Sequence, residues 1–287
     1  MSTVGGAVTA SSFLIDSPRF EVQALRYAAT TAVLVAISAV ARRPNLRARR
    51  ARAGEWIWLF LAATSGQTIY NLALVGAVQH ADPAFVASVV SCVPLVLVLG
   101  APLFGRRRFR PDIAAAAVVV VAGAAIVYGG GETSPLGLCL SLVALAGEAA
   151  FTLFSLRVLD RLGPFSVAVH TCWIACLQLV VIGWVLGELR ASVPWPSSSA
   201  LAVAYLVAAS AFAFVAWFRA VESVGAEVAG LATGIIPVAA AVSGAALGIV
   251  PLRAQTLVGA AVVGVGVTGG AVLARRSPSQ PGLVGSS

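Results

Sequence analysis

Nine apolar runs of about 16–24 residues follow one another along the chain, separated by short polar connections. About 20 apolar residues in a helix span a bilayer, whereas most helices of a soluble protein need a polar face. Only 10% of the residues are charged, against about a quarter in a soluble domain. The sequence therefore predicts an all-α integral membrane protein. The expected spans are residues 22–40, 56–78, 83–104, 113–128, 135–158, 165–186, 200–218, 228–250 and 256–273.

The net charge of +8 comes from arginines that lie mostly in the short loops. A basic protein can be a nucleic-acid binder, but arginines between apolar runs are explained by the positive-inside rule. With the N-terminus in the cytoplasm, 15 of the 19 arginines fall on the cytoplasmic side, and Arg26 lies near the outer end of its span. We therefore expect an inner-membrane, multi-pass protein with both termini cytoplasmic and no nucleic-acid partner.

The chain contains an internal repeat at a shift of 143 residues. Equivalent pairs under this shift are Ala77 and Ala220, Pro94 and Pro237, and Gly123 and Gly266. The shift predicts about ten transmembrane helices in two five-helix repeats, residues 1–130 and 131–274, with a truncated first helix at 1–15. An odd number of helices in each half makes the repeats inverted, which is typical of transporters with a substrate site near the midplane. The remaining 275–287 segment reads as a disordered cytoplasmic tail.

Glu148 stands in the middle of the 135–158 span. A charge at a helix centre costs about 2.5–3.5 kcal/mol and normally faces a bundle interior or a water-filled cavity. Ser141, Thr152 and Ser155 share its helical face. Two functional roles fit this acid: it carries a proton that couples export to the proton gradient, or it pairs with a cationic group of the substrate. A neutral structural acid is the alternative.

Counted with the 1–15 stub as the first, the third, fourth and seventh expected spans, residues 56–78, 83–104 and 165–186, hold further polar residues. Amides in lipid need hydrogen-bonding partners, whereas hydroxyl groups are more often explained by helix packing. His170 and Gln178, two turns apart, are weaker candidates because a structural histidine is the simpler explanation. The candidates for substrate or proton binding are Glu148, Thr152, Ser155, Gln67, Tyr70, Asn71, Ser88 and Ser91.

Pro94 and Pro237 occupy matching places in the two halves. Each lacks the N–H that would bond the carbonyl four residues back, so each favours a kink. We expect these prolines to be hinges for alternating access, with a static kink as the alternative.

Signatures of catalysis and of metal binding are missing from the sequence. The four cysteines lie inside apolar segments without a C-x-x-C pair, and the chain has no H-E-x-x-H, Walker or Ser-His-Asp set. We expect no cofactor, no metal and no enzymatic activity.

Two segments resemble the paired EamA-type repeats of the drug/metabolite transporter superfamily: ALVGAVQHADPAFVASVVSCVPLVLVL at 73–99 and WFRAVESVGAEVAGLATGIIPVAAAV at 217–242. Gly259 and Gly266 fit the small-residue helix that closes such a repeat. The resemblance implies ten helices in two inverted halves and efflux of amino acids, other small metabolites or drugs. It also implies a cavity lined by helices 1, 3, 4, 6, 8 and 9, a set that includes every site candidate above except His170 and Gln178.

The sequence thus predicts a secondary-active transporter that exports small metabolites with an amino group by alternating access, with proton coupling through Glu148 as one interpretation. The expected partners are a small-molecule substrate, the lipid bilayer and, in that interpretation, protons; a homodimer is compatible with the pattern. Two alternatives stay open. One is a non-transporting membrane scaffold or partner subunit, in which Glu148, Gln67 and Asn71 are freely replaceable. The other is a flippase of lipid-linked substrates with the same fold, whose cavity opens sideways to lipid.

Overall fold

The computed structural model describes residues 19–40, 48–104, 109–128, 132–189, 197–235, 238, 242 and 254–276. Within these ranges the regular secondary structure is helical, with one isolated bridge between Ala81 and Thr133. Six described helical stretches are long and apolar enough to cross a membrane, and one of them, Phe85–Phe104, contains a break described below. The expected stub at 1–15, the hinge residue Pro237 and the tail beyond 276 lie outside the described residues.

The described helices follow the expected spans closely. In chain order they are α2 (Arg19–Val40), η2 (Ala53–Glu55), α3 (Trp56–Ala63), η3 (Thr64–Ile69), α4 (Tyr70–Ala77), α5 (Pro83–Val90), α6 (Val93–Phe104), α7 (Pro111–Tyr128), α8 (Pro135–Leu162), α9 (Pro164–Val185), α10 (Ser197–Val224), α11 (Ala226–Leu231), η4 (Ala232–Gly234) and α13 (Ala254–Arg276).

Two expected spans are not regular helices along their length. In the third, η3 is a π-helical stretch between α3 and α4, closed by a bond from the Tyr70 N–H to the Ser65 carbonyl. In the fourth, α5 ends at Val90 and α6 begins at Val93. At this break the Cys92 N–H donates to the carbonyl of Val89, three residues back (3.0 Å), which tightens the turn just before Pro94, a residue with no N–H to donate.

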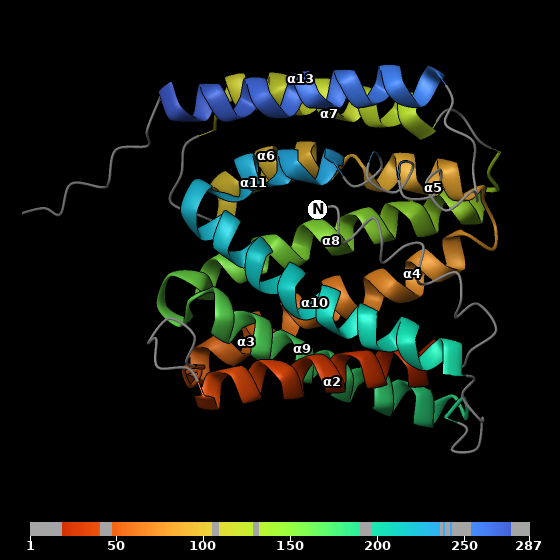
Figure 1. The fold of residues 1–287 in the computed structure, drawn as a ribbon, viewed down its shortest axis with the longest axis vertical. Helices are drawn as coiled ribbons and strands as arrows, with labels where there is room; N and C mark the ends of the chain where they lie inside the picture. Colours follow the sequence, from red (N-terminus) through yellow and green to blue (C-terminus); the bar gives the residue numbers. More distant parts are fainter. Residues whose placement is uncertain are drawn as a thin grey trace, which may run out of the picture.

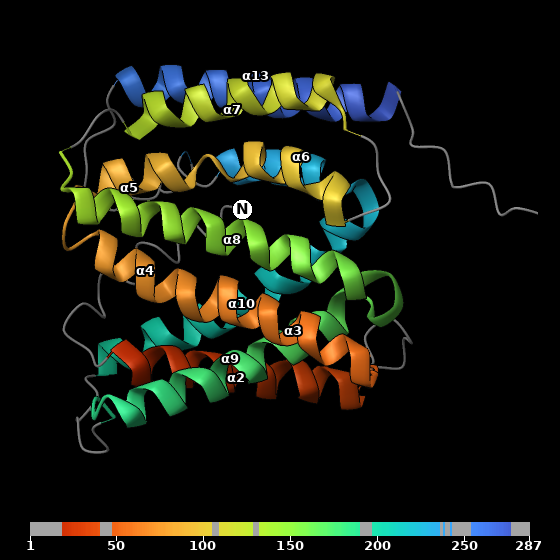
Figure 2. The same cartoon turned by 180° about the vertical axis from the view of Figure 1, so that it is seen from behind.

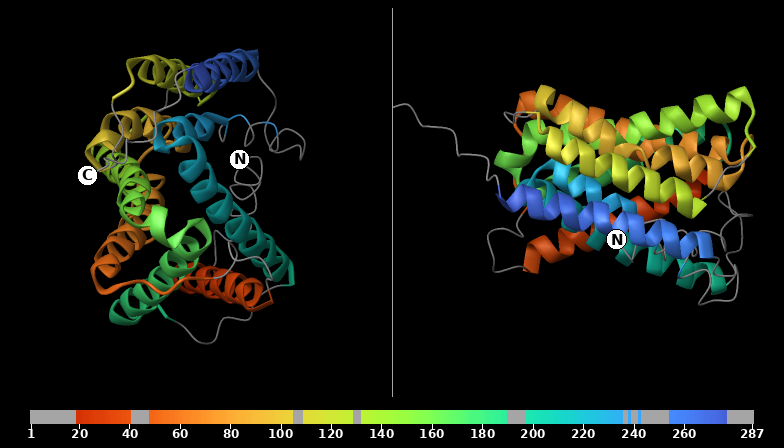
Figure 3. Two further views of the ribbon diagram at one scale, coloured as in Figure 1. Left: turned by 90° about the vertical axis from the view of Figure 1, so that its left-hand side faces the viewer. Right: turned by 90° about the horizontal axis from the view of Figure 1, so that it is seen from above.

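The helices run roughly parallel to a common axis in stacked layers (Figure 1). The view from behind shows α7 and α13 side by side at one end of the stack and α2 with α9 at the other (Figure 2). Seen along the helices, α8 and α4 lie on one side of the centre and α10 on the other, with α6 and α11 above and α2 and α9 below (Figure 3, left). This arrangement places α8, which carries Glu148, between the two end layers.

Helices α7 and α13 pack against each other in opposite directions through glycines. A Cβ on Gly123 would lie 2.7 Å from the Val263 nitrogen, and one on Gly259 would lie 2.7 Å from the Val127 nitrogen. A Cβ on Gly270 would come within 3.1 Å of Ala116. Residues later in α7 thus contact residues earlier in α13, so the two helices are antiparallel. Only a residue without a side chain allows backbones to approach this closely.

The 143-residue shift carries helices of the first half onto helices of the second. It places α2 on α9, the α3–α4 segment on α10, α5 on α11 with η4, and α7 on α13. The antiparallel contact of α7 with its equivalent α13 is the relation expected between halves that enter a membrane in opposite directions.

Segment 48–55 is fastened to the connection between α8 and α9. The Arg161 guanidinium pairs with both carboxylate oxygens of Glu55 and also donates to the Arg50 carbonyl (3.2 Å). In return, the Arg49 guanidinium donates to the Arg161 carbonyl (2.7 Å), and the Arg49 N–H donates to the Ser166 hydroxyl (2.9 Å). The basic segment before α3 is therefore held against the start of the second half.

We expect this ion pair to make stability depend on pH. Hydrogen bonding from Arg161 holds the pKa of the Glu55 carboxyl below its ordinary value of 4.5, with a further contribution from the Arg52 N–H. A lowered folded-state pKa adds stability above the unfolded pKa, and that stability is lost as the pH falls through the folded-state pKa. The melting temperature of the purified protein should therefore drop as the pH is lowered below about 4.5.

Glu55→Gln should lack this component of the pH profile, and Arg161→Gln should remove the larger part of it, leaving the part that the Arg52 N–H contributes. The double variant should lose no more of the pH-dependent stability than the Glu55→Gln variant does, because the two side chains form one interaction. A Glu55→Gln protein with the wild-type drop below this pH would contradict the assignment.

Candidate functional site

Glu148 lies near the middle of α8, within a span of mean hydropathy 1.9. Its Oε2 atom is buried and has no hydrogen-bond partner in the described structure. The preceding residue, Gly147, is in close contact with η3: a Cβ placed there would lie 2.6 Å from the Ser65 carbonyl oxygen. The acid is thus carried by a helix that is pressed against the π-helical stretch, and one of its oxygens is available to a ligand or a proton.

The other members of the polar stripe on α8 are buried but already bonded. The Ser141 and Ser155 hydroxyls each donate at 2.7 Å to the carbonyl four residues back on their own helix. The Thr152 hydroxyl accepts a hydrogen bond from the Trp217 indole of α10 (3.1 Å). Within this stripe, Glu148 is the residue with an unsatisfied buried oxygen.

The π-helical stretch η3 carries Gln67, whose side chain is 0% exposed. The Gln67 amide nitrogen is 3.4 Å from the Thr171 hydroxyl of α9, while its Oε1 is buried without a partner. Single-turn π segments inside α-helices are frequently found at functional sites because they re-aim side chains. A Cβ on Gly66 would lie 2.1 Å from the Phe151 Cβ of α8, so η3 and α8 meet at this residue as well.

Neighbouring polar residues of the third span bond to α9 and α2. Gln178 of α9 donates to the Thr64 hydroxyl (2.7 Å) and accepts from the Thr68 hydroxyl (2.6 Å). Asn71 donates to the phenol oxygen of Tyr27 on α2 (3.2 Å). Gln178 is therefore part of a bonded contact between helices.

The remaining candidates lie around this contact and at the break in the fourth span. Tyr70 is half-buried, and its backbone nitrogen would be 3.5 Å from a Cβ on Gly147. Ser88 and Ser91 are half-buried on α5 and at its end, where the Ser91 hydroxyl donates to the Ala87 carbonyl (2.7 Å). The structure thus places Tyr70 against Gly147, the residue before Glu148, and Gln67 three residues before Tyr70, whereas the two serines belong to the kinked segment.

Aromatic rings connect the helices that surround the centre. The Phe151 ring of α8 lies 6.0 Å from Phe214 and 5.3 Å from Phe218 of α10, measured between ring centroids. Phe214 in turn lies 6.2 Å from Tyr27 of α2. Together these four residues form an aromatic cluster between α2, α8 and α10, about one turn from Glu148.

Sequence reasoning missed a polar stripe on α2. Gln23, Arg26 and Thr30 are spaced three and four residues apart, and each has a buried side-chain atom without a partner. Thr64, Gln67 and Asn71 show the same spacing within residues 56–78, so the sequence contained the pattern that identifies the polar face of α2. Arg26 was instead counted among the arginines that set orientation.

His170 has a structural position near the basic segment. Its Nε2 lies 2.9 Å from the Arg49 carbonyl, and its Nδ1 accepts from the Trp173 indole (3.2 Å). The ring also packs edge-on against Trp56, with centroids 5.3 Å apart. These contacts fit the simpler explanation for this histidine.

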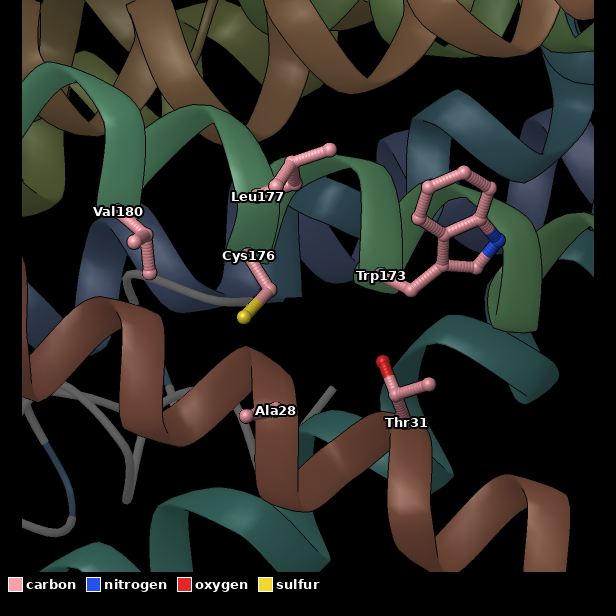
Figure 4. A pocket seen from close by; sticks show the side chains of 6 residues that line it. All are labelled: Ala28, Thr31, Trp173, Cys176, Leu177 and Val180. Atoms are coloured by element: carbon pink, nitrogen blue, oxygen red, sulfur yellow. The ribbon is translucent and has the colours of Figure 1, made fainter.

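A surface groove of about 460 Å³ lies between α2 and α9, and its lining includes none of the candidate site residues. Figure 4 shows Cys176 and Val180 of α9 on the side of the helix toward α2, which carries Ala28 and Thr31, and Trp173 and Leu177 also line the groove. The hydroxyl of Thr31 is bonded to the Tyr27 carbonyl (2.8 Å), so the groove offers an apolar wall. Its lining suits lipid chains better than a polar metabolite, and we do not assign it as the substrate site.

Comparison with known proteins gives a family and a fold. The sequence model of the EamA-like transporter family matches twice, at residues 2–129 and 135–269. A solved crystal structure that is 21% identical superposes with a TM-score of 0.79, covering 96% of this chain and 95% of that one. No curated protein matches the chain.

Proposed function

The chain belongs to the EamA-like transporter family, and from this premise we propose that it is a secondary-active exporter of small metabolites that carry an amino group. Family membership and the apolar helices make it a multi-pass membrane transporter of the drug/metabolite transporter superfamily. The substrate, the outward direction and the coupling are our proposal.

The observation that carries the proposal is the unpartnered buried oxygen of Glu148 on α8. A carboxylate in a membrane span is costly, and such residues mark substrate pathways or proton relays. An ionised Glu148 would attract an ammonium group, and a protonated one would carry a proton. Gln67, which has its own free Oε1 on the adjoining η3, supplies a second acceptor for N–H groups of a substrate.

Alternating access requires helices that change shape, and two described elements suit this requirement. The π-helical η3 carries Gln67 and packs against α8 through its Gly66, and the break at Ser91–Cys92 separates α5 from α6 just before Pro94. Hinges are short segments at the ends of elements that absorb backbone changes. We propose Pro94, and by the repeat Pro237, as hinge residues of an inward-to-outward cycle.

We further propose an inner-membrane location with both termini in the cytoplasm. The arginines of 48–52 and Arg161 gather at one end of the helices, where Arg161 binds Glu55 and Arg50. Arginine-rich short connections remain on the cytoplasmic side. In this orientation α8 begins outside and ends inside.

The test is a comparison of metabolites inside and outside cells that overproduce the protein or carry the empty vector. The proposal expects amino-bearing metabolites to be enriched outside, and the same compounds to leave proteoliposomes containing the purified protein faster than empty liposomes. Equal levels in both cell lines, together with equal release from both kinds of liposome, would overturn the proposed function.

A further inference from the structure

Helix α2 presents three polar residues on one face: Gln23, Arg26 and Thr30. Three of their atoms are buried without a hydrogen-bond partner: Gln23 Oε1, Arg26 Nε and Thr30 Oγ1. Thr30 is 0% exposed. A threonine in a helix usually satisfies its hydroxyl on the preceding turn, as Thr31 does with Tyr27. The polar face of α2 therefore points into the protein with unused hydrogen-bonding capacity.

Arg26 lies inside the membrane span, eight residues along α2. Its guanidinium carbon lies 4.6 Å from the centroid of the Tyr27 ring, a cation–π contact. In the described part of the chain the ion pairs are Arg110 with Asp112 and Arg161 with Glu55, so Arg26 has no carboxylate partner there. An arginine that extended to the membrane surface would keep its donors in water, whereas here Nε is buried.

Contacts connect Arg26 with the level of Glu148. The Tyr27 phenol beside it accepts from Asn71 (3.2 Å), and residue 70 lies against Gly147, the neighbour of Glu148. The aromatic cluster links Tyr27 through Phe214 to Phe151, one turn beyond Glu148. A cation on α2 and an acid on α8 thus flank one aromatic cluster, and neither has a charged partner in the described residues.

Charged residues inside a membrane span are costly and mark substrate or ion pathways, and Arg26, with its buried Nε, is such a residue. The planar guanidinium donates two parallel hydrogen bonds to a carboxylate, and the Thr30 hydroxyl is placed to add a third. The Oε1 atoms of Gln23 and Gln67 are acceptors and suit N–H groups of the same molecule. These side chains therefore match a ligand that has an anionic group at one end and hydrogen-bond donors at the other.

We propose that Arg26 binds a carboxylate of the transported molecule, so that the substrates are small zwitterions with a carboxylate at Arg26 and an ammonium group toward Glu148. This inference rests on the proposed function and narrows it, because an amine without a carboxylate would leave Arg26 unpaired. Gln67 lies on η3, which packs against both α8 and α9, and its buried Oε1 is a further acceptor without a partner.

The experiment uses the purified full-length protein in lipid nanodiscs with the twenty L-α-amino acids as probes. Each compound that binds is compared with the amine that lacks its carboxylate and with the acid that lacks its amino group, by calorimetric Kd. Arg26→Gln should weaken zwitterion binding by about 30-fold or more, since one partner of a desolvated charge pair is lost. It should leave the Kd of the amine unchanged, and Arg26→Lys should give an intermediate loss because it keeps charge without the planar fork.

A structural arginine would give a different result. Without ligand, Arg26→Gln should melt close to the wild-type temperature, because removing a charge without a carboxylate partner offsets the loss of the cation–π contact with Tyr27, and a clear drop would overturn the inference. Arg157→Gln, which removes an exposed arginine at the end of α8, should keep wild-type Kd values.

The inference also fails if Arg26→Gln binds the zwitterion as tightly as the wild type, or if no carboxylate-bearing probe binds. These outcomes are separable from failure of the proposed function. Export of carboxylate-bearing zwitterions that continues at the wild-type rate in Arg26→Gln cells overturns only the role of Arg26, whereas equal metabolite levels with and without the protein overturn transport itself.

Discussion

Glu148→Gln is expected to reduce net export by about 30-fold or more while leaving the protein in the membrane, because removing one partner of a desolvated charge interaction costs about 2–5 kcal/mol. The amide keeps the size of the side chain and cannot be ionised. Since Oε2 of Glu148 has no partner among the described residues, the substitution breaks no bond seen in the structure. Folding should therefore be nearly unaffected, and the loss should appear in the initial rate of efflux from proteoliposomes.

Glu222→Gln is the matched control, because Glu222 is an exposed acid on α10. Substrate exchange without a proton gradient separates the two roles of Glu148. If the acid carries the proton, the Gln variant should still exchange labelled substrate across the membrane; if it pairs with the ammonium group, exchange and binding should be lost together. Wild-type efflux in the Gln variant would remove Glu148 from the mechanism and favour the non-transporting scaffold.

The order and position of the helices were largely predictable because hydropathy and loop charge act on whole segments. The shift that pairs Gly123 with Gly266 also places α7 on α13, which the structure packs together through those glycines. The π-helical η3 was not predictable, since Thr64 to Ile69 read as an ordinary part of a span and one extra residue per turn leaves no trace in hydropathy. The kink before Pro94 was foreseen, but the complete break at Ser91–Cys92 was not.

Individual site residues were harder to predict, because a sequence shows which residues share a face and not which groups are already bonded. Ser141, Thr152, Ser155 and Glu148 share one stripe, yet three of them have partners in the structure. Arg26 was missed for a related reason. Arginine is the residue that signals orientation in loops, so its place on a polar face of α2 was overlooked.

Glycine contacts position the acid, which leads to a second large effect. We expect Gly147→Ala to destabilise the protein by about 1–3 kcal/mol, the usual range for overpacking. The added Cβ would lie 2.6 Å from the Ser65 carbonyl oxygen, and backbone cannot rotate away as a side chain can. α8 and η3 must separate, which also displaces Glu148, the next residue along α8. Denaturation in detergent would measure the stability, and efflux per folded molecule would measure the function.

Gly264→Ala is the matched control on α13, since a Cβ at Gly264 meets nothing within 4 Å. There the same substitution should stabilise the helix by up to about 1 kcal/mol, through helix propensity alone. The two variants thus differ in sign because of packing and not because of the residue type. If Gly147→Ala were as stable and as active as Gly264→Ala, the contact between α8 and η3 would be dispensable, and Glu148 would not depend on the π-helical stretch for its position. If stability fell while efflux per folded molecule stayed at the wild-type level, the contact would be structural, and Glu148 would act independently of the packing of α8 on η3.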